Sequence, residues 1–356
     1  MTPNNVNVGI RYGGSAAFRK RIANGFLIGF PLLGSLYALF YFSHHRVLPF
    51  AVLQMVLWYV VTALGVGVGF HRYFTHRSFQ TTPVMRLLFG VAGSFTFQGS
   101  VIRWIADHRR HHRFSDEPPD VHTPHRYPIL HRVWSRMRNL WHGHVGWMFD
   151  DSSTVVEIYA PDLLRDPIAR WLDRWYPCVL CVSLLLPYLC GLFYGGYEVA
   201  FQSLLLGGFV RITLLHNVTW AINSIGHTWG TRPSTINDES RNNWFLAVLT
   251  FGEGWHNNHH AAPRCAYNNW RGHELDFSGA LIRILERLGA VWAVVTKHGF
   301  VTTEFRAAAA SSTPPPSISF YAERHQHQTF GSSRGGCRCR SAEQSDATLS
   351  LQLAIA

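Results

Sequence analysis

Charged side chains are scarce in this chain of 356 residues, at 15% of the total, whereas soluble domains carry about one quarter. This shortage argues against an ordinary soluble protein. Cysteine is scarce as well: there are six, and none stands beside the histidine clusters described below, which argues against a zinc finger or an iron–sulfur cluster. The net charge of +11 comes without a recognition motif for nucleic acid, so we expect no nucleic acid among the partners.

In place of charge the chain has apolar runs that are long enough to cross a bilayer. A helix needs about 20 residues to span the hydrocarbon layer. Four runs have that length: 24–43, 50–70, 177–196 and 199–222. We therefore expect an all-α integral membrane protein whose four transmembrane helices form two hairpins. A further apolar stretch, 83–104, carries two arginines, and we expect it to lie at the membrane interface.

The basic residues predict the orientation. They precede the first run and fill the long segment 71–176, whereas the two short links carry only Arg46. Because positively charged loops stay in the cytoplasm, we expect a multi-pass protein with both termini and the long segment inside. The expected parts are a basic cytoplasmic arm (1–23), a membrane domain (24–306) and a disordered tail (307–356), which opens with a run of Ala, Ser and Pro and is too poor in large apolar residues to fold.

Three histidine clusters stand next to the apolar runs. Their sequences are HRYFTH, HRRHH and HNNHH, and the last two place histidines at i, i+3 and i+4, on one face of a helix. A fourth element, NSIGH, places Asn223 four residues before His227. All of them fall on the predicted cytoplasmic side, where imidazoles can hold a transition metal. His122, His125 and His131 follow no helical register and are left out of this set.

These side chains are too many for one metal ion. Two ions with four or five nitrogen ligands each would use them all, and Asn223 could hold a water on the poorer site. A ligand set without carboxylates disfavours magnesium, calcium and manganese, which leaves a pair of irons that activates dioxygen. Asp107 and Glu253 adjoin two of the clusters, and each is either the acceptor for a ligand ring's far nitrogen or a solvated charge.

The four motifs resemble those of a known family. GVGVGFHRYFTHRSF, ADHRRHHRFSD, NSIGH and GEGWHNNHH are similar to motifs of the membrane fatty-acyl desaturases, in the acyl-CoA delta-9 branch, over about residues 25–300. The resemblance implies a four-helix membrane stalk under a cytosolic helical cap that holds two Fe²⁺ ions. It also implies the following site residues: His71, His76, His108, His111, His112, His227, His256, His259 and His260 as ligands, Asn223 through a water, and Trp220 beside the acyl channel.

The same resemblance implies a reaction. Such an enzyme uses O₂ to place a cis double bond, here at delta-9, in a saturated long-chain fatty acyl thioester during unsaturated fatty acid biosynthesis. With no HPGG motif of a fused haem domain, the electrons are expected from a separate ferredoxin or cytochrome b5 type donor. Phe149, Asp150 and Asp151 follow HVGWM where relatives have a basic pair that contacts CoA, and Ala106 replaces an expected arginine. The headgroup therefore stays open among CoA, a lipid and a carrier protein. DESRNNW and NNHH look bacterial, which implies the bacterial inner membrane.

Two other functions compete with this one. A related diiron membrane hydroxylase or oxygenase of alkyl or sterol substrates would share the clusters, but its first cluster commonly has a gap of three residues, whereas here four residues separate His71 and His76. A metal transporter would need ligands along a pore. The predicted spans hold few polar residues apart from Arg211, Asn217 and nearby hydroxyls, which disfavours transport.

Overall fold

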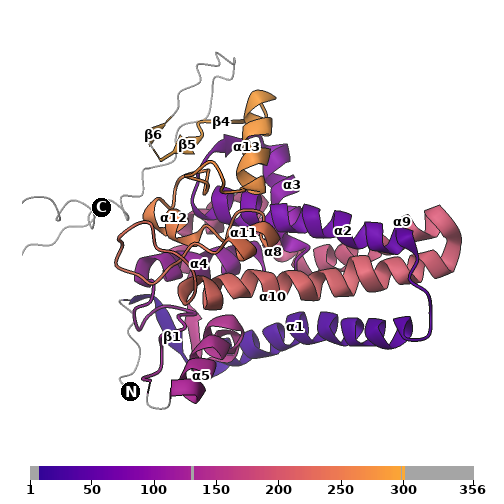
Figure 1. Cartoon of the computed structure of the whole chain (residues 1–356), viewed down its shortest axis with the longest axis horizontal. Helices are drawn as coiled ribbons and strands as arrows, with labels where there is room; N and C mark the ends of the chain where they lie inside the picture. The colour runs from indigo at the N-terminus through magenta and orange to yellow at the C-terminus, as the bar shows by residue number, and fades with distance from the viewer. Residues whose placement is uncertain (1–7, 130–131, 298, 301–356) are drawn as a thin grey trace, which may run out of the picture. The chain divides into compact units, whose positions relative to one another are not determined.

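Long apolar helices dominate the described part of this computed structural model, residues 8–129, 132–297 and 299–300. Three helical stretches are long and apolar enough to cross a membrane: Gly14–Phe42, Pro49–Thr75 and Tyr176–His227. In Figure 1 their main parts, α1 (Gly14–Phe42), α2 (Pro49–Leu64), α9 (Tyr176–Ser203) and α10 (Arg211–Ser224), run side by side. The expectation of a mostly helical protein with membrane-length helices is confirmed.

The longest of these stretches is interrupted by two glycines. Gly195 and Gly196 leave helical geometry, and Gly196 has a φ of 80°, a conformation that favours glycine. The break falls on the last two residues of the third predicted span (177–196), shortly before the fourth begins at 199. Beyond it the chain continues through a π-helix, η4 (Leu204–Val210), which packs back against α9.

Arg211, the one charge within the last apolar run, is fully buried and bonded to neutral oxygens. Its guanidinium donates to the carbonyls of Gly207 (2.9 Å) and Phe95 (2.9 Å), and to the Ser183 hydroxyl (3.0 Å). Since a buried polar group is costly unless it is hydrogen-bonded, these bonds make the residue tolerable there. They also join α10 to α9 and to the turn at Phe95.

The stretch 83–104, which we expect to lie at the membrane interface, is not one continuous helix. α3 (Pro83–Ser94) begins with Thr82 as its N-cap, whose side chain accepts from Met85 N, and α4 (Val101–Phe114) follows after a turn. Phe97 (φ 61°) and Gly99 (φ 104°) within that turn prevent a continuous helix.

The remaining elements are short and surround the histidine-bearing end of the long helices. The helices are η2 (Gly65–Thr75), α5 (Arg132–His144), η3 (Gly146–Phe149), α6 (Val156–Tyr159), α7 (Pro161–Arg165), α8 (Pro167–Arg174), η5 (Ile225–His227), α11 (Trp244–Leu249), α12 (His256–Ala261) and α13 (Phe277–Arg287). Three antiparallel strand pairs complete the described part: β1 (Ile10–Tyr12) with β3 (Ser152–Thr154), β2 (Gln80–Thr81) with β4 (Val291–Trp292), and β5 (Val295–Thr296) with β6 (Gly299–Phe300).

The described part of the predicted arm is structured. Ile10–Tyr12 pairs with Ser152–Thr154, and α1 begins at Gly14, ten residues before the predicted span. The predicted tail, 307–356, lies outside the described residues, in a second unit (Phe305–Ala356) that is separate from the unit described here (Met1–Glu304).

A buried apolar cluster supports the histidine-bearing end of the unit. It joins η2, α4 and α6–α8 through side chains that include Phe70, Phe74, Ile105, Tyr159 and Leu172. Because η2 and α4 carry two of the histidine clusters, this packing holds those clusters in a fixed relation.

Candidate metal centre

The nine predicted histidines meet in two groups. The five-histidine half consists of His71, His76, His108, His112 and His259, and the four-histidine half consists of His111, His227, His256 and His260. Within each half one ring nitrogen from every residue lies within 4.8 Å of the others. The side chains come from η2 and its C-cap, α4, η5 and α12, so segments far apart in the sequence build both halves.

Helix α4 supplies rings to both halves. His108 and His112, one turn apart, belong to the five-histidine half, and His111 belongs to the four-histidine half. α12 divides its rings in the same way, with His259 in one half and His256 and His260 in the other. The i, i+4 pairs therefore share a half, whereas the third ring of each cluster lies in the neighbouring half.

The first cluster depends on a change of helix type. α2 continues into η2, a π-helix in which each residue bonds to the residue five positions before it, and His76 N donates to His71 O at 3.1 Å. The five-residue spacing, irregular on an α-helix, thus becomes one full turn. As a result both rings face the five-histidine half, with ring centroids 4.8 Å apart.

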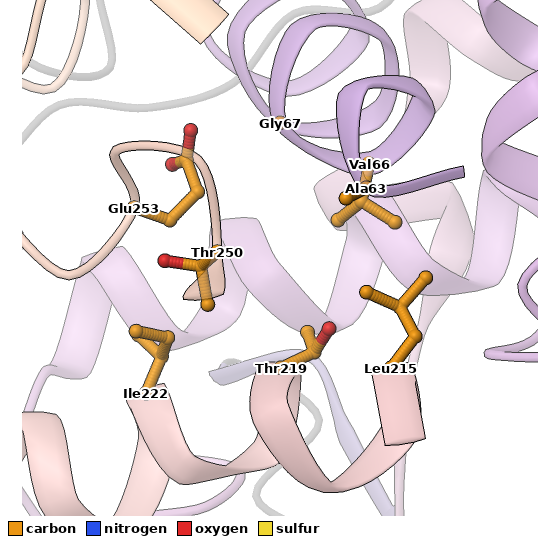
Figure 2. Close-up of a pocket in the computed structure, with 8 residues that line it drawn as sticks. All are labelled: Ala63, Val66, Gly67, Leu215, Thr219, Ile222, Thr250 and Glu253. Carbon is orange, nitrogen blue, oxygen red and sulfur yellow. The ribbon is translucent and has the colours of Figure 1, made fainter. Parts of the chain in front are cut away.

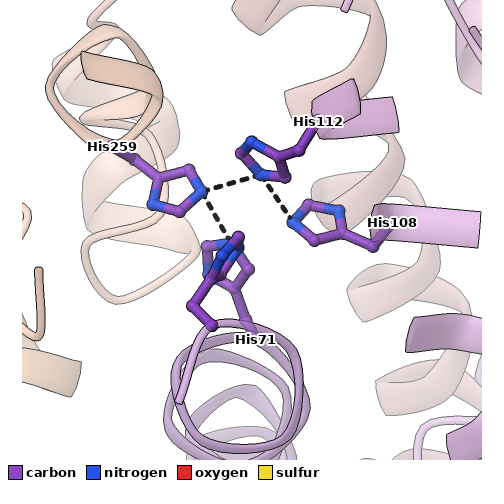
Figure 3. Close-up of side chains that lie close together, drawn as sticks. His71, His108, His112 and His259 are labelled. Atoms are coloured by element: carbon purple, nitrogen blue, oxygen red, sulfur yellow. Dashed lines mark hydrogen bonds between the residues drawn. The ribbon is translucent and has the colours of Figure 1, made fainter. Parts of the chain in front are cut away.

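The distances between ring nitrogens fit ligands around a common ion. His259 Nε2 lies 3.0 Å from both His71 Nε2 and His112 Nε2, and His112 Nε2 lies 3.1 Å from His108 Nε2 (Figure 3). In the other half, His227 Nε2 and His256 Nε2 are 3.0 Å apart. Two nitrogens at right angles around an ion, each at a bond length of about 2.1 Å, lie about 3.0 Å apart.

Buried ring nitrogens without a partner support the same interpretation. Among the described residues, His76 Nε2 is such an atom: it is inaccessible to solvent and has no hydrogen-bond partner. Burial, followed by the charges of neighbouring rings, lowers the pKa of His108, His112 and His256 well below the ordinary value. Neutral rings keep the lone pairs that a transition metal needs, so the residues present fit such an ion.

Four carboxylates face the outer nitrogens of ligand rings. The Nδ1 atoms and their partners are His111 with Asp120 (3.0 Å), His227 with Asp116 (2.8 Å), His260 with Asp238 (2.7 Å) and His71 with Glu253 (2.5 Å). A carboxylate that accepts from Nδ1–H fixes the ring's tautomer, which leaves the Nε2 lone pair directed inward. Burial opposes ionisation of Asp120, but the charge and hydrogen bond of His111 hold its pKa at about 2.

Three of these carboxylates were missed by sequence reasoning. Asp116, Asp120 and Asp238 lie in loops without periodicity. The sequence did contain a signal for them. Only 21 acidic residues occur in the chain, and two of these three aspartates closely follow the histidine cluster HRRHH.

The other predicted residues lie in different surroundings. Glu253 lies against His71, as given above, whereas Asp107 accepts a hydrogen bond from the Thr154 hydroxyl. Asn223 is half-buried in the last turn of α10, before His227. Trp220 is buried beside Val145 and Met148.

His122, left out by the sequence argument, is buried beside the four-histidine half. Its ring centroid lies 4.3 Å from that of His111, and it forms a further group with His111 and Asp120. It reaches this place from a loop, where helical spacing gives no guidance.

A small cavity approaches the five-histidine half from between the long helices. It measures about 30 Å³ and is lined by Ala63, Val66 and Gly67 on one side and Leu215, Thr219 and Ile222 on the other, with Thr250 and Glu253 at its end (Figure 2). Since Glu253 contacts His71, this largely apolar space lies close to the ring nitrogens.

Comparison with known proteins gives a consistent result. The family model for the fatty acid desaturases matches residues 46–272. A hex-5-enoyl-[acyl-carrier protein] acetylenase from Moorena producens is 36% identical over 74% of this chain and 83% of its own length. An sn-1 stearoyl-lipid 9-desaturase from Anabaena variabilis is 33% identical over 66% of this chain and 80% of its own length. An acyl-CoA C20 Delta5-desaturase from Anemone leveillei is 33% identical over 65% of this chain and 70% of its own length.

Proposed function

The chain belongs to the fatty acid desaturase family, and we propose that it introduces a cis double bond, at delta-9, into a saturated long-chain acyl group with two irons, O₂ and electrons from a separate donor protein. The observation that carries the proposal is the gathering of nine imidazoles, most of them buried, into two adjacent groups at the end of membrane-length helices. Two bound irons would supply the activation of dioxygen that removal of hydrogen from an unactivated methylene pair requires.

The protein's own side chains would hold the metal ions, orient the ligand rings and keep water away from the site. The nine rings named above would hold the irons, five in one half and four in the other, with Asn223 near the poorer half. The four carboxylates would keep the four rings that they face, those of His71, His111, His227 and His260, in one tautomer. The cavity between Val66 and Leu215, at about 30 Å³, has room for only a small part of an acyl chain. We therefore propose that it is one section of an apolar path, along which the lie of the chain determines positional selectivity. Trp220 is proposed to line the same path.

We propose a four-span arrangement with the metal centre and both termini in the cytoplasm of a bacterial cell, and hence the inner membrane. The helix break at Gly195 and Gly196 supports the division of Tyr176–His227 into two spans. The basic segment 71–176 supports the orientation. The histidine-bearing helices α4 and α12 lie together at one end of the long helices (Figure 1), which fits a cap on one side of the bilayer.

For the headgroup we propose a lipid rather than CoA. Arg21 forms an ion pair with Asp151, and Arg126 forms one with Asp150. The acidic pair after HVGWM thus neutralises two nearby guanidinium groups, which makes this surface less attractive to the phosphates of CoA. Relatives named as lipid desaturases are frequent among the matches, although one named relative acts on acyl-CoA and another on an acyl-carrier protein.

The test is expression in a host that cannot make unsaturated lipids, followed by mass spectrometry to locate new double bonds. We expect a delta-9 alkene from the unaltered chain and none from His108→Ala, with both proteins present in membranes. His45→Ala, an exposed histidine in the link between α1 and α2, is the matched control and should keep full activity. An alcohol instead of an alkene would point to the hydroxylase, and full activity of His108→Ala would refute the ligand assignment.

A further inference from the structure

The negative charge around the two halves of the metal centre is distributed unevenly. In the four-histidine half, three of the four rings have a carboxylate oxygen within 3.0 Å of Nδ1: those of His111, His227 and His260. In the five-histidine half, the corresponding ion pair within the described residues is that of His71 with Glu253.

The three aspartates of the four-histidine half are held by neutral donors. Asp116 accepts from Glu239 N (2.8 Å) and the Thr123 hydroxyl (2.9 Å). Asp120 accepts from Asp116 N (2.9 Å) and His122 N (3.2 Å).

Asp238 is held in the same way, by the backbone N–H (2.9 Å) and hydroxyl (2.6 Å) of Ser240. Hydrogen bonds of this kind stabilise the ionised carboxylate without cancelling its charge. Among the described residues, no Lys or Arg forms an ion pair with a carboxylate oxygen of these three aspartates; Arg232 donates to the backbone carbonyl of Asp238 instead. Three carboxylates without a guanidinium or ammonium on their oxygens therefore surround this half.

Glu253, in contrast, shares its charge with a buried guanidinium. Arg72 is 1% exposed and donates to Glu253 Oε1 through Nε (3.2 Å) and Nη2 (2.8 Å). The same guanidinium binds both oxygens of Asp276, at 3.0 and 2.9 Å. Two carboxylates and one cation leave a single net negative charge near the five-histidine half.

This difference in negative charge between the two halves would affect how easily a metal ion bound in each half is oxidised. A nearby negative charge stabilises a more highly charged ion, and it does so strongly in a buried site where water screens little. A ring hydrogen-bonded to a carboxylate is also a more basic ligand. Both effects are larger in the four-histidine half.

We propose that the two metal positions are inequivalent, and that Asp116, Asp120 and Asp238 make the iron of the four-histidine half the first to be oxidised. The inference rests on the proposed function, because it takes iron as the bound metal. Oxidation of an iron held there would be the loss of one electron to an external one-electron acceptor, the mediator dye of the test below, and no bond of the protein would be made or broken.

The test uses the full chain in detergent, loaded with ⁵⁷Fe and poised at stepped potentials with mediator dyes in the absence of oxygen. Mössbauer spectra count ferrous and ferric iron at each potential. We expect two one-electron steps, separated by a mixed-valence stage in which one of the two irons of each chain is ferric. A single step, in which both irons are oxidised together, would overturn the inference.

Single substitutions show which half of the metal centre gives rise to each oxidation step. Asp120→Asn and Asp238→Asn should move the first step to higher potential and leave the second in place, whereas Glu253→Gln should move only the second. Glu239→Gln is the matched control, because this residue adjoins Asp238 but pairs with Arg232 and Arg241. A shift of the first step by Glu253→Gln would contradict the assignment.

If a variant binds too little iron for the redox titration, the number of irons bound per chain is measured instead. Loss of a carboxylate partner lowers metal affinity by about 10–100-fold, so Asp120→Asn should fall from two irons per chain toward one. Loss of both irons from this variant would refute independent halves. If the unaltered chain binds no iron, the proposed function fails. If it binds two irons that show a single step, only the present inference fails.

Discussion

Gly65 on η2 and Gly93 on α3 lie backbone to backbone, with no room for a side chain between them. A Cβ built on Gly65 would lie 2.5 Å from Gly93 N and 2.4 Å from the carbonyl carbon of Ala92. This contact determines how closely α3 packs against the π-helix that carries His71. The ring positions therefore depend on residues with no chemistry of their own.

Gly65→Ala should destabilise the protein and loosen the first cluster. Overpacking a tight contact costs about 1–3 kcal/mol, and here the neighbour is backbone, which cannot rotate away. The melting temperature in detergent should fall, and iron content should fall with it. Gly25→Ala on α1, where a Cβ would meet nothing within 4 Å, is the control and should leave both unchanged. An equal melting temperature for the two variants would contradict the packing argument.

Removal of metal should lower stability. The converging ring nitrogens repel one another unless an ion lies between them, and a ligand that binds only the folded state stabilises it by mass action. We expect the melting temperature to drop after treatment with a chelator and to recover when Fe²⁺ is added back. His111→Ala should show a smaller drop, since it already lacks one ligand. Insensitivity of the unaltered chain to chelator would argue against a resident metal.

The apoprotein should lose stability as pH falls below 6.5. Burial first, and then neighbouring charge, lowers the pKa of His108, His112, His256 and His259 in the folded state. The unfolded chain takes up protons at about pH 6.5, whereas the folded chain does not, so protons favour unfolding. Melting temperatures measured between pH 8 and 5 should be level at first and then fall. The fall should be shallower in His256→Ala, and an identical profile would count against the lowered pKa values.

Filling the cavity should impair turnover without removing iron. Ala63 and Leu215 face each other across it (Figure 2), and Ala63→Leu adds bulk where an acyl chain is proposed to lie. We expect a loss of product of at least about tenfold, equivalent to about 1.4 kcal/mol, with unchanged iron content. Val61→Leu, at an exposed position on the same helix, provides the comparison. Equal activity of both variants would place the acyl chain elsewhere.

The sequence predicted the residues of the centre better than their arrangement. Apolar runs and histidine spacing are local signals, so the membrane-length helices and all nine rings could be read from them. The π-helix at Gly65–Thr75 could not, because it results from close packing against α3. The sharing of α4 between the halves, with His111 facing away from His108 and His112, depends on how four segments meet. The aspartates come from loops, whose course has no sequence period.

The division of α4 also has a mechanical consequence. Consecutive residues, His111 and His112, have ring centroids 5.4 Å apart and serve different halves. The spacing between the two halves thereby depends on the positions of neighbouring residues on one helix. Among the groups described, no carboxylate lies between the halves to bridge them. A change in the separation of the two halves would therefore require these neighbouring rings to change their side-chain torsion angles or the backbone of α4 to move.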